Sequence, residues 1–214
     1  MTTAVRIPSG AIEAAKWFAL VAMTADHVDA FFFGRELPGW TALGRLAFPL
    51  FALVLAYNLA RPGADALRPI GKLLAFAALS TVPHAYLTGA LFPVNILVTF
   101  AVAAAVIGCV DRGWHGQAAA FFLAGGWVVE YHWPGVALVV AACWFFRAPS
   151  EGRAWLCALP LLALYLVNGS AWHLLAVPLL AAFAAWAPDV DRNRWAFWTY
   201  YPAHLGVFAL LAYA

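Results

Sequence analysis

The segment from residue 11 to residue 33 reads AIEAAKWFALVAMTADHVDAFFF, and this long apolar run decides the fold class. At about 1.5 Å of rise per residue, a helix of some 20 residues covers the roughly 30 Å hydrocarbon core of a bilayer. Asp26 and His27 stand side by side within the run. A charged side chain at such a depth costs on the order of 2.5–3.5 kcal/mol on insertion scales, and ionisable residues inside membrane helices generally have a function. The pair is therefore the first candidate for a functional site.

The composition of the whole chain agrees with a membrane location. Of the 214 residues, 65% are hydrophobic and only 10% are charged, whereas a soluble domain carries about 25% charged residues. The apolar residues come in unbroken runs, such as LVTFAVAAAVIGCV at 97–110. Unbroken runs of this length are typical of membrane helices. We predict an all-α, polytopic membrane helical bundle that forms a single integral membrane domain over residues 1–214.

Prolines, glycines and charged residues divide the chain into nine predicted transmembrane helices. They cover 11–33, 42–60, 71–89, 94–110, 117–130, 134–147, 154–167, 172–187 and 195–213. The fifth, sixth and seventh have only about 14 residues, or roughly 21 Å of helix. Either they thin the bilayer locally or a pair of them forms a re-entrant hairpin.

The basic residues assign a side of the membrane to each predicted loop. Ten of the twelve fall on the side of the N-terminus, namely Arg6, Lys16, Arg61, Arg68, Lys72, Arg112, Arg147, Arg153, Arg192 and Arg194. Only Arg35 and Arg45 fall on the other side. By the positive-inside rule, the N-terminus is cytoplasmic and the C-terminus lies outside.

With the sides assigned, the unusual polar residues gather in the outer half of the predicted bundle. They are Asp26, His27, Arg45, Asn95, Glu130, Tyr201 and His204. Histidines, carboxylates and an arginine in a low-dielectric interior are typical of a site for proton transfer. Simpler interpretations remain open. The Asp26–His27 pair could be a polar clamp, Arg45 a snorkelling residue, Asn95 a helix cap and Glu130 a solvated turn residue.

The cysteines do not indicate a metal centre. Cys109, Cys143 and Cys157 lie far apart, and each stands in an apolar run. Their spacing matches no ligand pattern, so we interpret them as small packing residues and expect no metal site.

Four segments of the chain resemble the TraX family, membrane proteins associated with acetylation of F-type conjugative pilin. They are Thr24-Ala25-Asp26-His27, the block GRLAFPLF at 44–51, Asn95-Ile96-Leu97 followed by Thr99, and Tyr201-Pro202-Ala203-His204-Leu205. The GRLAFPLF block is the most specific of the four. The resemblance covers nearly the whole chain, and it extends to the wider group of transmembrane acyltransferases, in which a histidine of an early helix serves the transfer.

The resemblance implies a multi-pass acetyltransferase of the bacterial inner membrane. Such an enzyme would use cytoplasmic acetyl-CoA and acetylate an amine or hydroxyl at the membrane or beyond it, on a pilin N-terminus or a cell-surface glycan. Asp26, His27, Arg45, Asn95, Tyr201 and His204 match family positions, and Glu130-Tyr131 is similar to an acidic-Tyr pair of the family. Its partners would be membrane lipids, acetyl-CoA and the acceptor, with no nucleic acid.

On this reading His27 is the general base that takes a proton from the acceptor as it attacks the thioester carbonyl. A covalent acetyl-His27 intermediate is the variant mechanism. Neighbouring helix residues point about 100° apart, so we expect Asp26 to pair across helices, with Arg45 or His204. Arg45, Asn95 or Tyr201 would donate hydrogen bonds to the oxyanion.

The phosphates of CoA would need basic partners on the cytoplasmic face. The candidates are Arg61, Arg68, Lys72, Arg147 and Arg153. The positive-inside rule alone accounts for basic residues on this face equally well.

Two other classes of protein fit the same polar residues. A proton-coupled transporter for small solutes also places Asp, His and Glu within the membrane. We detect no repeated halves of the kind common in such transporters. A non-catalytic membrane assembly protein would not need the polar residues to share one level.

Overall fold

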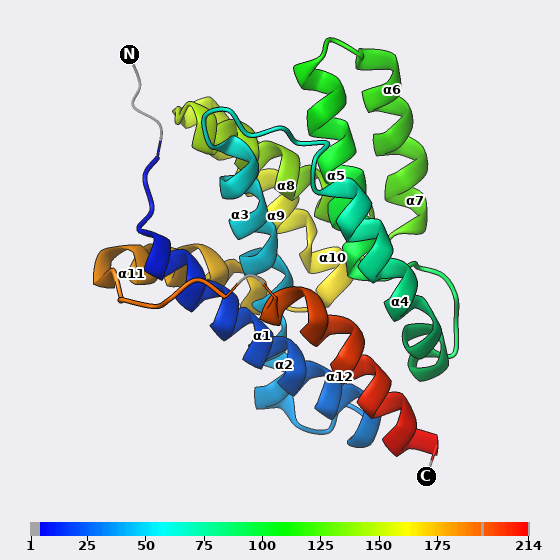
Figure 1. Cartoon of the computed structure of the whole chain (residues 1–214). Helices are drawn as coiled ribbons and strands as arrows, with labels where there is room; N and C mark the ends of the chain where they lie inside the picture. The colour runs from blue at the N-terminus through cyan, green and yellow to red at the C-terminus, as the bar shows by residue number, and fades with distance from the viewer. Residues whose placement is uncertain (1–4, 194, 214) are drawn as a thin grey trace.

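The computed structural model describes residues 5–193 and 195–213, and over these residues it is a bundle of helices without a β-strand (Figure 1). Arg194, one of the ten basic residues used to assign the sides, lies outside the described residues. The all-α class predicted from the sequence is confirmed for the described part of the chain.

The first third of the chain forms a long helix and two further helices that meet within the block GRLAFPLF. They are α1 (Ser9–Phe32), α2 (Pro38–Gly44) and α3 (Ala47–Ala60). The prediction of one helix over 42–60 is corrected, because a turn at Arg45 and Leu46 separates α2 from α3. Both turn residues keep near-helical backbone angles, so the apolar run continues through the interruption.

The middle of the chain follows the predicted order with one irregular stretch. Its elements are α4 (Ile70–Thr88), α5 (Ile96–Asp111), α6 (His115–Ala120), the π-helical turn η1 (Phe121–Gly125), α7 (Gly126–Val128) and α8 (His132–Arg147). The turn between α7 and α8 pairs with Val94, which donates to the Val128 carbonyl and accepts from the Glu130 amide. The region before α5 and the α7–α8 turn therefore lie at the same level.

The last third is more broken than the sequence predicts. It comprises α9 (Glu151–Ala163), α10 (Tyr165–Asn168), the 3₁₀ turn η2 (Trp172–Leu175), α11 (Ala176–Trp186) and α12 (Ala196–Tyr213). The predicted helices 154–167 and 172–187 are each divided in two. Pro160 inside α9 removes one backbone donor shortly before the first break.

The arrangement of these helices defines two ends of the molecule. The loops 61–69, 112–114 and 148–150 lie together with residues 5–8 at one end, which we call the basic end (Figure 1). The loop after α1 and the end of α12 lie at the opposite end. α3 runs through the middle and packs against α1 and α8, and its buried residues include Leu50, Ala52 and Ala56.

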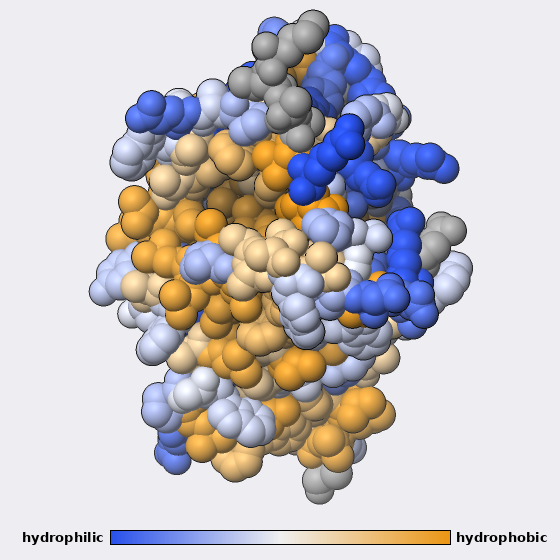
Figure 2. Space-filling view, turned by 90° about the vertical axis from the view of Figure 1, so that its left-hand side faces the viewer, coloured by the Kyte–Doolittle hydropathy of each residue, from blue (hydrophilic) through white to orange (hydrophobic). Residues whose placement is uncertain are grey.

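Two helical segments of the described chain are long and apolar enough to cross a membrane. They are Pro38–Ala60, which includes the turn at 45–46, and Ile70–Thr88. The 24-residue α1 is long enough, but it carries Glu13, Lys16, Asp26 and Asp29. Large apolar side chains such as Val82, Leu166 and Leu210 are at least 72% exposed. One face of the molecule is broadly apolar, with hydrophilic residues gathered towards the top and the right-hand side of the view (Figure 2). The helices thus agree with a membrane-associated protein.

Candidate functional site

A pair of histidines joins the first and last helices. His27 of α1 and His204 of α12 lie with Nδ1 of the first 2.8 Å from Nε2 of the second, and their ring planes are 5° apart. His204 is buried, and the Tyr200 ring lies 5.0 Å from it on a nearly parallel plane. Both histidines belong to the predicted site, but their contact with each other was not predicted.

The hydrogen bonds around this pair determine which nitrogens carry protons. His204 Nδ1 lies 2.9 Å from the Tyr200 carbonyl. A carbonyl only accepts, so Nδ1 of His204 must carry the proton, and Nε2 of a neutral His204 is an acceptor. His27 Nδ1–H then donates to it, which leaves a lone pair on His27 Nε2. This nitrogen is the basic atom of the pair.

Two residues missed by the sequence analysis hold α1 and α12 in register. Thr24 Oγ1 donates to the Leu20 carbonyl at 2.8 Å, so the Tyr200 hydroxyl, also 2.8 Å away, donates to Thr24. Thr24 and Tyr200 each lie one helical turn before a histidine of the pair. That three- or four-residue spacing on one helix face is the signal that could have identified them.

Asp26 does not pair with Arg45 or His204, so that prediction is corrected. Its Oδ1 lies 3.2 Å from the guanidinium of Arg35, in the loop after α1. The Arg35 backbone adopts a left-handed conformation, with φ of 65°, and its amide donates to the Asp29 carbonyl. This turn folds Arg35 back over the end of α1. The carboxylate of Asp26 therefore pairs with Arg35 and not with a residue of another long helix.

Asp26 also explains a glycine of the GRLAFPLF block. A Cβ atom added to Gly44 would stand 2.2 Å from the Cβ of Asp26, so α2 can approach α1 this closely only with glycine there. Asp29, a carboxylate absent from our prediction, fastens the same contact. It is fully buried and accepts from the Leu37 amide and from the Thr41 hydroxyl. Asp26 and Asp29 therefore position α2 beside His27.

Asn95 has a structural role in the bundle. Its Oδ1 caps α5 by accepting from the Leu97 amide, and its Nδ2 lies 3.0 Å from the Ala77 carbonyl and 3.3 Å from Thr81 Oγ1. No amide hydrogen is left for an oxyanion. We therefore remove Asn95 from the predicted oxyanion donors.

Glu130, Tyr201 and Arg45 surround the site from other elements. Glu130 is close enough to Tyr201 and to Asp26 for electrostatic interaction, and Thr99 fixes its backbone carbonyl at 2.7 Å. Tyr201 is 5% exposed. Arg45 makes no ion pair with a carboxylate of the described residues, and its buried Nε has no hydrogen-bond partner.

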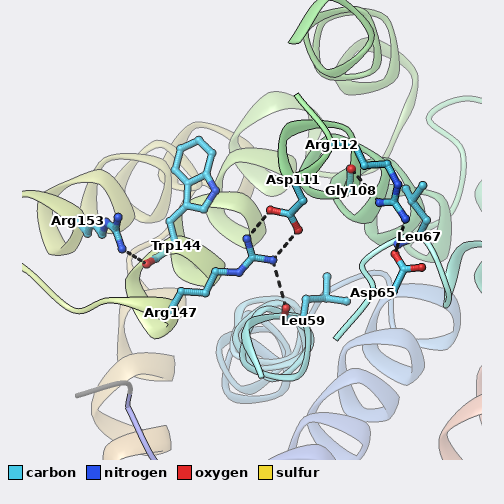
Figure 3. A network of polar contacts seen from close by, with 9 residues as sticks. All are labelled: Leu59, Asp65, Leu67, Gly108, Asp111, Arg112, Trp144, Arg147 and Arg153. Atoms are coloured by element: carbon cyan, nitrogen blue, oxygen red, sulfur yellow. Dashed lines mark hydrogen bonds and ion pairs between the residues drawn. The ribbon is translucent and has the colours of Figure 1, made fainter. Parts of the chain in front are cut away.

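Three of the five residues predicted to bind CoA make contacts within the protein. Arg147 forms a two-pronged ion pair with Asp111, and Arg153 donates to carbonyls at the end of α8, including that of Trp144 (Figure 3). Lys72 lies over the rings of Trp195 and Trp198, 4.3 and 4.6 Å from their centroids.

A further ion pair closes the network at the basic end. Arg112 lies 3.0 Å from Asp65 and also donates to the Gly108 carbonyl (Figure 3). Its guanidinium holds the pKa of the Asp65 carboxyl below its usual value. Arg112, Arg147 and Arg153 thus tie together the helix ends at this end of the molecule.

The remaining two predicted CoA residues, Arg61 and Arg68, form no ion pair within the described chain. Arg61 and Arg6 line a cavity of about 570 Å³ at the basic end, together with Tyr57 and Phe146. Arg68 is exposed nearby on the same loop. Two guanidinium groups at one cavity are suited to an anionic ligand.

These features define the class: an all-helical, predominantly apolar protein with a histidine-centred polar site between its first and last helices. The family model described as TraX protein matches residues 11–212, and the chain belongs to the TraX family. It is 31% identical to Protein TraX of Escherichia coli and 29% identical to Protein TraX of Escherichia coli strain K12. Each similarity covers 92% of this chain and 85% of the relative. No solved structure matches the chain.

Proposed function

We propose that this TraX-family chain is an integral membrane acetyltransferase that moves an acetyl group from cytoplasmic acetyl-CoA to an amine or hydroxyl of an acceptor. The acceptor lies in the membrane or at its outer side, as a pilin N-terminus or a cell-surface glycan would. The observation that carries the proposal is the proton arrangement of the histidine pair. It leaves Nε2 of His27 as a free base, held in orientation by His204 and the Tyr200 carbonyl.

The transfer needs a base, and His27 supplies it. Nε2 takes the proton of the acceptor while the acceptor nitrogen or oxygen forms a bond to the thioester carbon. The carbon–sulfur bond then breaks, and the leaving thiolate receives the same proton from the imidazolium, which gives free CoA and the acetylated acceptor. His204 stabilises the transient positive charge of His27 through the hydrogen bond between them.

The oxyanion of the intermediate needs a donor in the same dry environment. Of the three predicted donors, Asn95 has no free hydrogen. Tyr201 is buried three residues before His204 on α12 and keeps its hydroxyl near Glu130. We therefore assign the oxyanion to Tyr201.

Acetyl-CoA enters from the basic end, where the cavity beside Arg6 and Arg61 receives its phosphates. That cavity lies at the C-terminal end of α3, whereas α2 and the start of α3 pack beside the histidine-bearing α1. The 14 residues of α3 span about 20 Å. The pantetheine arm would extend along this length to bring the thioester to His27.

Entry of acetyl-CoA at the basic end implies an orientation of the chain in the bacterial cytoplasmic membrane. The basic end faces the cytoplasm, as the positive-inside rule requires, and the chain crosses the bilayer several times with its C-terminus outside. Nine crossings remain our proposal, supported by the nine apolar segments of the sequence.

Membranes from cells that express the chain test the proposal when they are given acetyl-CoA labelled in its acetyl group. We expect label to accumulate in a surface protein or glycan, identified by mass spectrometry against cells without the gene. Label transfer that does not depend on the chain would contradict the proposal. Uptake of a solute into sealed vesicles without acetyl transfer would instead favour the transporter.

A further inference from the structure

Most of the buried polar atoms without partners belong to four residues outside the histidine pair. Within the described chain, six buried side-chain nitrogen and oxygen atoms lack a hydrogen bond, and five of them belong to Arg45, Asn168, Ser170 and His173. Folded proteins leave few such atoms, because an unpaired polar group loses its water without compensation. A cluster of five therefore indicates a group that binds there.

These residues come from two neighbouring parts of the fold. Asn168 ends α10, Gly169 reverses the chain in a left-handed conformation, and His173 lies in η2. η2 packs against α2 and α3, which meet at Arg45, and Arg45 is close enough to His173 for electrostatic interaction. We call these four residues the Arg45 pocket.

Two residues of the Arg45 pocket are buried inside the protein. His173 is fully buried and Asn168 is 7% exposed. His173 Nε2 lies 2.8 Å from the Leu161 carbonyl, so Nε2 is the donor, and Nδ1 of the neutral ring is unprotonated and lies beside the Ser170 backbone. The contact with Leu161 thus fixes the orientation of the ring.

The donors and acceptors without partners indicate which chemical groups the ligand carries. Arg45 offers a positive charge without an ion-pair partner among the described residues, and the Asn168 amide and the Ser170 hydroxyl add neutral donors. These groups suit an anionic oxygen group. Asn168 Oδ1 is a buried acceptor without a partner, so the same ligand should also carry a hydroxyl or an amine nearby.

We propose that the Arg45 pocket binds the anionic group of the acceptor, a carboxylate or phosphate with a neighbouring hydroxyl or amine. The pocket and the histidine site lie at the same level of α1, since Gly44 next to Arg45 packs against Asp26 next to His27. Its assignment to the acceptor rests on the proposed function. The anion can belong to a soluble molecule or to a lipid headgroup, since both present the same chemistry.

Binding can be measured without acetyl transfer, on the purified full chain in nanodiscs of phosphatidylcholine. The probes are glycerol 3-phosphate and glycerate, with glycerol as the neutral control, and the readout is the thermal midpoint during titration. We expect a saturable rise with both anions and none with glycerol. Arg45→Gln should weaken binding roughly 10- to 100-fold, whereas Arg192→Gln, which removes an exposed arginine elsewhere, should leave it unchanged.

A second pair of variants separates binding from folding. Asn168→Leu and Ser170→Ala remove unpaired polar atoms, so the thermal midpoint without probe should stay the same or rise while the affinity falls. A lower midpoint would show that these atoms are bonded within the protein and would overturn the proposal. In nanodiscs that also contain phosphatidylglycerol, a weaker response to glycerol 3-phosphate identifies the lipid headgroup as the source of the anion, and an unchanged response identifies a soluble molecule.

Absence of a saturable shift with both anions in both kinds of nanodisc, or an equal shift in Arg45→Gln, would also overturn the pocket. A different result would reject the proposed function and leave the anion site intact. If the wild type binds the probes but transfers no acetyl group, the anion site stands and the acetyltransferase does not.

Discussion

His204 controls which nitrogen of His27 is free, and this single residue can be tested without disturbing His27 itself. In His204→Ala, the Nδ1–H of His27 loses its acceptor, so the ring can turn and change tautomer. We expect the turnover number for acetyl transfer to fall roughly 100-fold. His204→Gln should recover much of it, because the Gln Oε1 can accept the same hydrogen bond.

Tyr200→Phe is the matched control for this pair of variants. It keeps the backbone carbonyl that fixes His204 and removes the hydroxyl that helps to hold α1 and α12 in register, so its turnover should fall much less than that of His204→Ala. Equal losses in His204→Ala and His204→Gln would contradict a positioning role for His204.

The arginines of the basic end separate by their contacts into ligand-binding and structural residues. Arg61→Gln should raise the KM for acetyl-CoA about tenfold and leave the thermal midpoint unchanged, because Arg61 lines the cavity and has no carboxylate partner in the described chain. Arg147→Gln should do the reverse. It breaks the ion pair with Asp111, in which the side chain of each partner is 29% exposed. We expect the thermal midpoint to fall by about 2–4 °C. Steady-state kinetics and thermal unfolding of both variants check this prediction. A lower thermal midpoint in Arg61→Gln together with a higher KM in Arg147→Gln would contradict it.

At the scale of elements, the contact between α1 and α2 depends on one glycine. Gly44→Ala would drive a methyl group into the side chain of Asp26, and such overpacking costs typically 1–3 kcal/mol. We expect both the thermal midpoint and the turnover to fall. Gly39→Ala lies in the same short helix with nothing within 4 Å of the added methyl, so it should change neither. Equal behaviour of the two variants would refute the close contact.

The positions of the helices could be predicted from the sequence, whereas their interruptions could not. Apolar runs bounded by Pro, Gly and charge predicted α1, α4, α5 and α12 within a few residues. The break at Arg45 escaped because its backbone angles stay near-helical and the apolar run continues. The break after Ala163 occurs inside an equally apolar stretch.

The same limit applies to the site. The depth of Asp26, His27 and His204 follows from counting residues along helices, but their partners do not. Asp26 reaches Arg35 because residues 33–37 turn back over α1, and a left-handed residue in that turn is not visible in the sequence. Asp29 was overlooked because its ligands, the Leu37 amide and Thr41, belong to that turn and to α2.

At the scale of the whole molecule, acetyl-CoA can enter the cavity beside Arg61 only if the basic end faces the cytoplasm. Glu151 begins α9 at that end, and Glu36 lies in the loop after α1 at the other; both are exposed. In a variant whose three cysteines are replaced by serine, Glu36→Cys should react with an impermeant maleimide in intact spheroplasts. Glu151→Cys should react only after lysis. The opposite pattern would invert the topology and place the cavity beside Arg61 on the wrong side for cytoplasmic acetyl-CoA.

The most direct measurement is the release of free CoA thiol from acetyl-CoA by the purified chain in nanodiscs, with extract of the cell surface as the source of acceptor. The wild type should release thiol in proportion to acetylated product. His27→Ala should lose at least about 100-fold in rate with an unchanged thermal midpoint, since the imidazole is half-buried and is needed for the proton transfer. Release by His27→Ala as fast as by the wild type would contradict the assignment of His27 as the base of an acetyl transfer.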